Sequence, residues 1–179
     1  MTRDQLEHAI RAACDLTDET EVIVFGSQAI LGQFPDAPDE LRQSVEADIS
    51  PMQSVDKVDL IDAVLGLDSS FHRLHGFYVH GLPVSEAAVF PLGWEARTIP
   101  VRNDNTRNFT GWCIEAHDLA ASKLIAYRPK DLDFVRALLK HQLVRPRKLI
   151  ARIRRMPGAD ELEERLVTWV SRTMRELNG

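Results

Sequence analysis

The fold is decided by one stretch of the sequence, Glu21-Val22-Ile23-Val24-Phe25-Gly26-Ser27-Gln28-Ala29-Ile30-Leu31. Its first half is rich in β-branched and aromatic residues, which is typical of a buried strand. The strand stops at Gly26-Ser27, and Gln28–Leu31 predicts a short helix. Glycine permits a tight turn and the close approach of a ligand, and the start of a helix offers unpaired amides to a phosphate. The stretch therefore predicts a strand, a turn that suits phosphate, and a helix.

The next predicted strand, Val45-Glu46-Ala47-Asp48-Ile49, carries two carboxylates and is followed by Pro51. Residues two apart in a strand point to the same side, roughly 7 Å apart. Carboxylates on one face of an otherwise apolar strand are costly to bury without cations. Mg²⁺ suits such a pair because it is a hard ion that binds carboxylate oxygens and substrate phosphates. The alternative is an edge strand with a solvated acidic face.

The remaining pattern predicts an α+β fold in which a mixed sheet flanked by helices is followed by a helical segment. We expect residues 1–115 to form the α/β core and residues 116–179 to pack on it as C-terminal helices. Thr2 is a candidate cap for the first helix. The expected helices are 4–14, 58–67, 116–127, 131–141, 146–155 and 160–177, and the expected further strands are 76–80, 87–90, 96–101 and 109–114.

Composition and charge narrow the class of protein. The chain has 179 residues, of which 44% are hydrophobic, and a formal net charge of −5. No apolar stretch approaches the roughly 20 residues that span a bilayer, and the N-terminus does not read as a secretory signal. Cys14 and Cys113 lie far apart and in no metal-ligand spacing, which favours reduced thiols. We therefore expect a cytoplasmic protein without a membrane partner.

A basic segment, Arg145–Arg155, interrupts this acidic chain. It contains no acidic residue, and its basic residues are Arg145, Arg147, Lys148, Arg152, Arg154 and Arg155. Such a patch is compatible with phosphate contacts, as in an RNA-binding surface, and equally with a solvated helix face.

The order of the first two motifs matters more than either one alone. A strand, a Gly-Ser turn, and a neighbouring strand with acid-x-acid resemble the signature of the nucleotidyltransferase superfamily. The resemblance implies that Gly26 and Ser27 help to hold a nucleoside triphosphate and that Glu46 and Asp48 bind divalent metal. Aspartate is more common than glutamate at the first acidic position of that superfamily.

A second match lies in Glu115–Leu124 and Arg128–Phe134. These segments resemble the lysine motif and the Arg-x-Lys-Asp motif of nucleotidyltransferase-like proteins from bacterial toxin–antitoxin and phage-abortive-infection systems. The resemblance implies that Lys123 and Asp131 face the nucleotide and support catalysis. From the residues alone, Asp131 could instead be a helix cap that forms a surface pair with Lys123. The whole resemblance spans about Val22–Leu139 and is closest to a bacterial family of unassigned function.

One departure concerns a third carboxylate, which active members of the superfamily usually add from a later strand. Glu86, Glu95 and Glu115 are candidates without a distinguishing pattern, and Asp131 is a substitute. His72, His75 and His80 lie close together in sequence, but their spacing suits no familiar zinc site, so we do not expect them to bind metal.

The sequence therefore predicts a Mg²⁺-dependent enzyme that transfers a nucleoside monophosphate from a nucleoside triphosphate to a hydroxyl of RNA (tRNA-like) or protein. Its expected partners are the nucleotide, an RNA acceptor held by Arg145–Arg155, and a cognate antitoxin. The alternative is a module with the same fold that binds a nucleotide or a partner without turnover.

Overall fold

The computed structural model describes residues 1–158 and 161–179. The chain divides into two compact units. The first consists of Met1–Ala87 and Thr98–Glu115, and the second of Ala88–Arg97 and Ala116–Gly179. That the C-terminal helices pack on the sheet domain stays a prediction.

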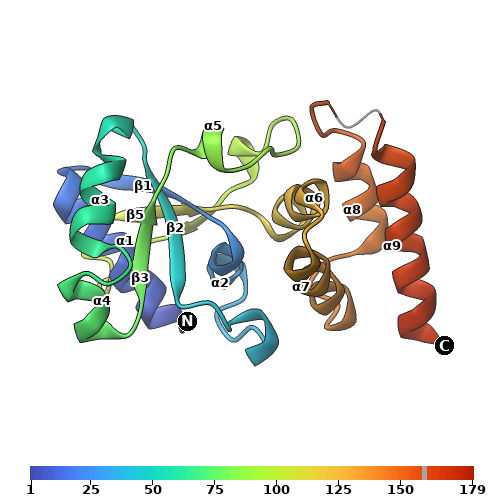
Figure 1. The fold of residues 1–179 in the computed structure, drawn as a ribbon, viewed down its shortest axis with the longest axis horizontal. Coiled ribbons are helices and arrows are strands. Elements are labelled where there is room, and N and C mark those ends of the chain that lie inside the picture. The colour runs from blue at the N-terminus through green and yellow to red at the C-terminus, as the bar shows by residue number, and fades with distance from the viewer. Residues whose placement is uncertain (159–160) are drawn as a thin grey trace. The chain divides into compact units, whose positions relative to one another are not determined.

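A mixed five-stranded sheet forms the centre of the first unit, within the residues described (Figure 1). Its strand order is β3-β2-β1-β5-β4. Strand β1 runs antiparallel to β2 and parallel to β5, β2 runs parallel to β3, and β4 runs antiparallel to β5. This arrangement confirms the predicted α+β class. The strands are β1 (Glu21–Phe25), β2 (Glu46–Pro51), β3 (Tyr78–Gly81), β4 (Ile99–Val101) and β5 (Thr110–Cys113).

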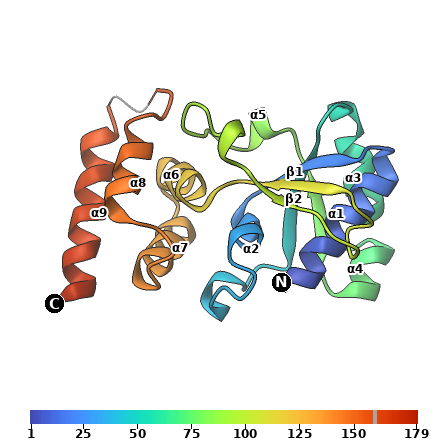
Figure 2. The same cartoon turned by 180° about the vertical axis from the view of Figure 1, so that it is seen from behind.

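Helices α1 (Arg3–Thr17) and α3 (Val58–Leu65) lie on the same side of this sheet (Figures 1 and 2). Both helices pack closely on the strands. A Cβ on Gly111 of β5 would lie only 2.4 Å from the Ile10 side chain of α1, and a Cβ on Gly81 of β3 would lie only 2.3 Å from the Val58 carbonyl oxygen of α3. Thr2 caps α1 with a complete capping box, as the sequence predicts. The covered face of the sheet supplies buried core residues: Val22, Val24, Ala47, Ile49 and Val79.

The opposite face of the sheet carries polar side chains, because successive side chains of a strand point to alternate faces. Because Val24 pairs with Ile49 and Ala47 with Val79 on the covered face, Glu46, Asp48, Tyr78 and His80 all point to the other side. These four side chains are each half-buried. The sheet therefore separates an apolar face, which holds the core, from a polar face.

Shorter helical segments connect the strands. The predicted helix after Gly26-Ser27 consists of a 3₁₀ turn (Ser27–Ala29) and α2 (Ile30–Gln33), and the first unit also contains α4 (Ser70–His75) and α5 (Val84–Ala87). The predicted strand at 87–90 is wrong. The amides of Glu86 and Ala87 both donate to the Pro83 carbonyl, which closes a helical turn at that place.

The second unit is helical, as predicted for the C-terminal part of the chain. It contains α6 (Ala116–Ala126), α7 (Pro129–Lys140), α8 (Pro146–Ile153) and α9 (Glu163–Asn178). The predicted start of the last helix, Asp160, lies outside the described residues. The segment 88–97 is held to these helices by a hydrogen bond from the Leu92 amide to the Arg155 carbonyl (2.9 Å) and by an ion pair between Arg97 and Asp118 (2.7 Å).

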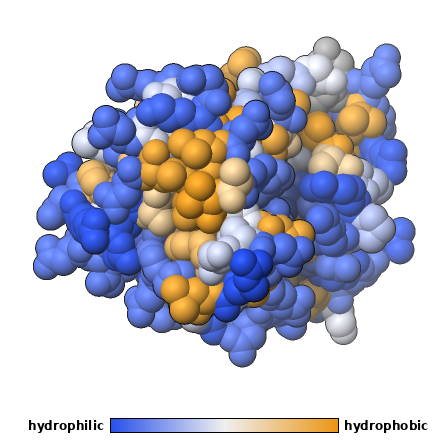
Figure 3. All heavy atoms as spheres, turned by 60° about the vertical axis from the view of Figure 1, so that its left-hand side comes forward, coloured by the Kyte–Doolittle hydropathy of each residue, from blue (hydrophilic) through white to orange (hydrophobic). Residues whose placement is uncertain are grey.

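Some hydrophobic side chains of the first unit stay outside its core. Leu60, Val64 and Leu67 recur along the outer face of α3 and just beyond it, where they are exposed, and Figure 3 shows hydrophobic residues gathered on this side. Cys14 and Cys113, by contrast, are buried and unpaired, and burial raises the pKa of both thiols to about 12. None of the helices in residues 1–158 and 161–179 has the length and hydropathy needed to cross a membrane.

Candidate metal and nucleotide site

The Gly-Ser turn and the acidic strand meet directly at the end of β1. Gly26 has a φ of +66°, a backbone conformation that L side chains rarely adopt. A Cβ at this position would lie 1.8 Å from Oδ2 of Asp48, so the carboxylate occupies the space that any other residue would fill. The two motifs are therefore one structural feature, in which glycine lets the Asp48 carboxylate lie against the turn.

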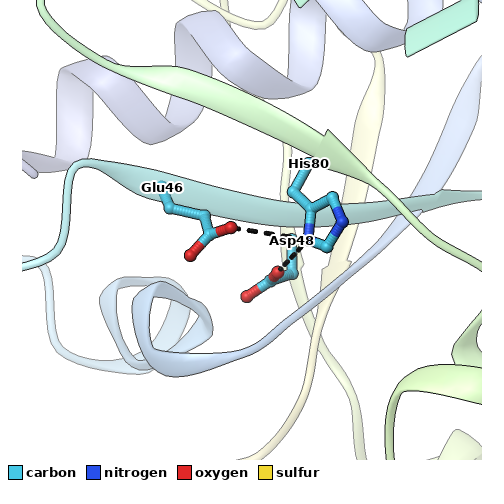
Figure 4. A group of neighbouring side chains, drawn as sticks. All are labelled: Glu46, Asp48 and His80. Carbon is cyan, nitrogen blue, oxygen red and sulfur yellow. Dashed lines mark hydrogen bonds and ion pairs between the residues drawn. The ribbon is translucent and has the colours of Figure 1, made fainter. Parts of the chain in front are cut away.

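Glu46 and Asp48 share the polar face of the sheet with a histidine from the neighbouring strand. In the parallel pairing of β2 and β3, Asp48 is the partner of His80. The His80 Nδ1 atom lies 3.2 Å from Asp48 Oδ1 and 3.4 Å from Glu46 Oε1. Figure 4 shows the three side chains directed toward one another from the two strands. Their side chains are 34% (Glu46), 21% (Asp48) and 38% (His80) exposed, which leaves them accessible to an ion.

Tyr78 extends this polar group along β3. It is the register partner of Glu46 and lies on the same face of the sheet. Burial, followed by the negative charges of Glu46 and Asp48, raises the pKa of the Tyr78 hydroxyl. The Tyr78 hydroxyl therefore stays protonated and neutral beside Glu46.

The three side chains fit a divalent cation. One ligand atom from each of Glu46, Asp48 and His80 can be chosen so that all three lie within 4.8 Å of one another. Neighbouring ligands around a small divalent ion, with bonds of about 2.1 Å, are about 3 Å apart, which is close to the two distances from the His80 nitrogen. The donor set, two carboxylates and one imidazole, is also chemically suited to such an ion. The assignment of Glu46 and Asp48 as metal ligands stays a prediction that this geometry supports.

Ser27 follows Gly26 and begins the 3₁₀ turn, where its side chain is half-exposed. The roles of Gly26 and Ser27 in holding phosphates stay predictions. Among the described residues, none of the three candidates for a third carboxylate (Glu86, Glu95 and Glu115) belongs to a group that could hold a metal.

The predicted pair of Lys123 and Asp131 forms within the second unit. Lys123 Nζ of α6 lies 3.1 Å from Asp131 Oδ1 of α7, and Arg128 Nε lies 2.5 Å from Asp131 Oδ2. Asp131 is fully buried and lies in the first turn of α7, whose N-cap is Arg128, so it is neither an N-cap nor part of a surface pair. Burial alone would raise the pKa of Asp131, but the hydrogen bonds and charges of Arg128 and Lys123 hold it below its usual value.

Lys123 is itself largely buried, with its ammonium 4.8 Å from the centre of the Phe134 ring. The buried ion pair gives both residues a structural role within the second unit. The catalytic and nucleotide-binding roles that the resemblance implies for Lys123 and Asp131 stay predictions.

The basic segment is not a uniform surface. Arg152 is 13% exposed, and its Nε lies 2.8 Å from Asp118 Oδ1, an ion pair in which the N–H is not aligned for a hydrogen bond. Arg154 lies 3.3 Å from Glu163. Arg145, Arg147 and Arg155 are exposed. The predicted RNA-binding surface therefore loses Arg152, which turns inward.

The sequence predicts no metal binding at His72, His75 or His80. The structure differs for His80, which belongs to a group that could hold a metal ion. His72 and His75 belong to α4 and make ring contacts with Tyr78 (5.1 Å) and His8 (4.5 Å), respectively. His80 instead joins the acidic pair. The sequence showed only that His80 lies in a predicted strand, on the same side as Tyr78. The register between β3 and β2 brings it to Asp48.

A mixed sheet that places an acid-x-acid strand against a Gly-Ser turn is the arrangement of the nucleotidyltransferases. A family model described as nucleotidyltransferase of unknown function (DUF6036) matches residues 4–156, and the chain belongs to this family. Searches of curated proteins and of solved structures found no significant match.

Proposed function

We propose that this protein transfers a nucleoside monophosphate from a nucleoside triphosphate to a hydroxyl group of an RNA or protein acceptor. The acceptor oxygen would form a bond to the α-phosphorus, and pyrophosphate would leave. Family membership supports the reaction class, while the nucleotide and the acceptor belong to the proposal.

The observation that carries this proposal is the meeting of Glu46, Asp48 and His80 beside Gly26. Glu46 and Asp48 would hold the divalent cation, for which Mg²⁺ is the sequence-based expectation. When bound, the cation would neutralise charge on the phosphates and on the leaving pyrophosphate. The Gly26-Ser27 turn would position the triphosphate, so that catalysis consists mainly of positioning and charge neutralisation.

The first test is label transfer with the full chain. The protein is incubated with a divalent cation, each of the four α-labelled nucleoside triphosphates, and either total RNA or cellular protein. The test variant is Glu46→Gln/Asp48→Asn. The matched control is Asp56→Asn/Asp59→Asn, which removes two negative charges from exposed positions in the 3₁₀ turn before α3 and in the first turn of α3.

We expect label on one class of acceptor, a loss of about 100-fold or more in the test variant, and little change in the control, because a catalytic metal supplies several kcal/mol. Saturable binding of the nucleotide without any transfer would support the binding module instead. No binding and no transfer would contradict both functions.

Two finer expectations from the sequence belong to the same proposal. The basic segment Arg145–Arg155 would contact an RNA acceptor, and a cognate antitoxin would restrain the activity. If the protein acts as a toxin, its expression should arrest bacterial growth, and the Glu46→Gln/Asp48→Asn variant should not. Growth arrest by both proteins would separate toxicity from the metal site.

A further inference from the structure

His80 stands where it can complete the ligand set of the acidic strand. It belongs to β3, which pairs directly with β2, and its Nδ1 lies within 3.4 Å of an oxygen from each carboxylate (Figure 4). We propose that His80 is a third metal ligand and that the site therefore prefers a divalent transition-metal cation, represented by Mn²⁺, over Mg²⁺. This inference rests on the proposed function, because it concerns the same site.

The preference follows from the chemistry of the donors. Mg²⁺ is a hard cation that is bound almost entirely by oxygen and gives up its water reluctantly. Imidazole nitrogen is a softer ligand that suits first-row transition metals. Mn²⁺ accepts carboxylate oxygen and imidazole nitrogen together and shares octahedral coordination with Mg²⁺. Three protein ligands would leave positions for substrate phosphates.

The backbone beside His80 is held firmly in place, which favours a built site over a chance approach. The amide of Gly81, the next residue, donates to Asp62 Oδ1 of α3 at 2.9 Å. A Cβ on Gly81 would lie only 2.3 Å from the Val58 carbonyl oxygen, so β3 packs tightly on this helix. Beside β2, Gly26 at the end of β1 leaves the space that the Asp48 carboxylate occupies. Both sides of the group are thus fixed by close backbone contacts.

A competing role for His80 is that of a counter-charge that only neutralises Glu46 and Asp48. The two roles differ in a direct spectroscopic readout. Electron spin echo modulation of bound Mn²⁺ detects the ¹⁴N nucleus of a coordinated imidazole. A histidine outside the coordination shell gives a weaker ¹⁴N modulation. His80→Asp provides a third carboxylate, and His80→Asn is a second variant in case the first does not fold. His141→Ala, an exposed histidine at the end of α7, is the control.

The experiment titrates the full chain with Mn²⁺ alone, followed by the loss of its free aqueous resonance, and then with Mg²⁺ in competition. We expect wild type and His141→Ala to prefer Mn²⁺ and to show ¹⁴N modulation. We expect the His80 variants to lose the modulation and to lower the ratio of Mn²⁺ to Mg²⁺ affinity by about tenfold or more.

Two results would overturn the inference. If both cations bind but neither the ratio nor the modulation changes in the His80 variants, His80 is not a ligand and the proposed transferase stands. If neither cation binds, with or without nucleoside triphosphate, the proposed function fails together with the inference.

Discussion

At the scale of single residues, Gly26 determines whether the Asp48 carboxylate can take its place. Gly26→Ala should cost about 1–3 kcal/mol, because a φ of +66° with a ψ of −171° is a conformation that essentially only glycine adopts, and more for the clash with Asp48. It should also displace that carboxylate. We therefore expect Gly26→Ala to lower both the free energy of unfolding, measured in urea, and the affinity for Mn²⁺.

Gly76→Ala is a control for a positive φ without a clash. Gly76 has a φ of +72° and a ψ of 11°, in the left-handed helical region, and a Cβ there would meet nothing within 4 Å. This control should cost about 1–2 kcal/mol for its own left-handed backbone, with unchanged metal affinity. Equal effects of the two substitutions on both quantities would contradict the coupling between Gly26 and Asp48.

The same residues show what the sequence could and could not predict about the site. The alternation of strand side chains placed Glu46 and Asp48 on one face, because that rule depends only on neighbours within one strand. His80 was missed because its contact depends on which strand lies next to β2 and on the register between them. A shift of one residue in that register would turn His80 to the other face.

At the scale of secondary-structure elements, Asp131 joins α6 to α7 through a buried charge. Asp131→Asn keeps the shape of the side chain but removes the negative charge beside the ammonium of Lys123. Because loss of one partner of a buried ion pair is strongly destabilising, we expect a decrease of about 3 kcal/mol in the free energy of unfolding at pH 7. Asp133→Asn, at an exposed position two residues further along α7, should change it by less than about 0.5 kcal/mol.

The effect of Asp131→Asn should also depend on pH. Because the folded-state pKa of Asp131 is lowered, the ionised carboxylate stabilises the fold above its unfolded pKa of about 3.9, and this stabilisation is lost as the pH falls through the folded value. The difference between wild type and variant should be complete at neutral pH and shrink below about pH 4. Urea titrations across this range test the sign, and a difference that grows in acid would contradict it.

Prediction at this scale depended on how local the signal was. The strand Glu21–Phe25 was predicted at its observed bounds, because a β-rich run ends there at Gly26. The helix starts at Val58 and Pro146 were also predicted, the first from amphipathic spacing and the second from proline. The segment 87–90 misled because a short apolar run has no periodicity of its own, whereas Pro83 had already begun a helical turn.

At the scale of the whole molecule, the chain is acidic, with a net charge of −5, so contact with RNA must depend on a local basic surface. Charges further away than about 8 Å are largely screened at physiological salt, and only exposed side chains can neutralise phosphates. In the sequence, the six basic residues of Arg145–Arg155 look equivalent. The structure divides them, because Arg152 pairs with buried Asp118 beside Arg97.

An arginine-to-glutamine substitution should therefore affect stability at Arg152 and RNA binding at the exposed arginines. Arg152→Gln should remove one of the cationic partners of Asp118, and we expect it to lower the free energy of unfolding by about 1–3 kcal/mol without changing the salt dependence of RNA binding.

The triple variant Arg145→Gln/Arg147→Gln/Arg155→Gln should leave the free energy of unfolding within about 0.5 kcal/mol of the wild-type value. It should also reduce the slope of log affinity against log salt by about one for each phosphate that is no longer neutralised. Urea denaturation and RNA titrations at several salt concentrations measure both quantities. An unchanged slope in the triple variant would exclude this segment as the RNA-binding surface, and unchanged stability in Arg152→Gln would show that Asp118 does not depend on Arg152 for its counter-charge.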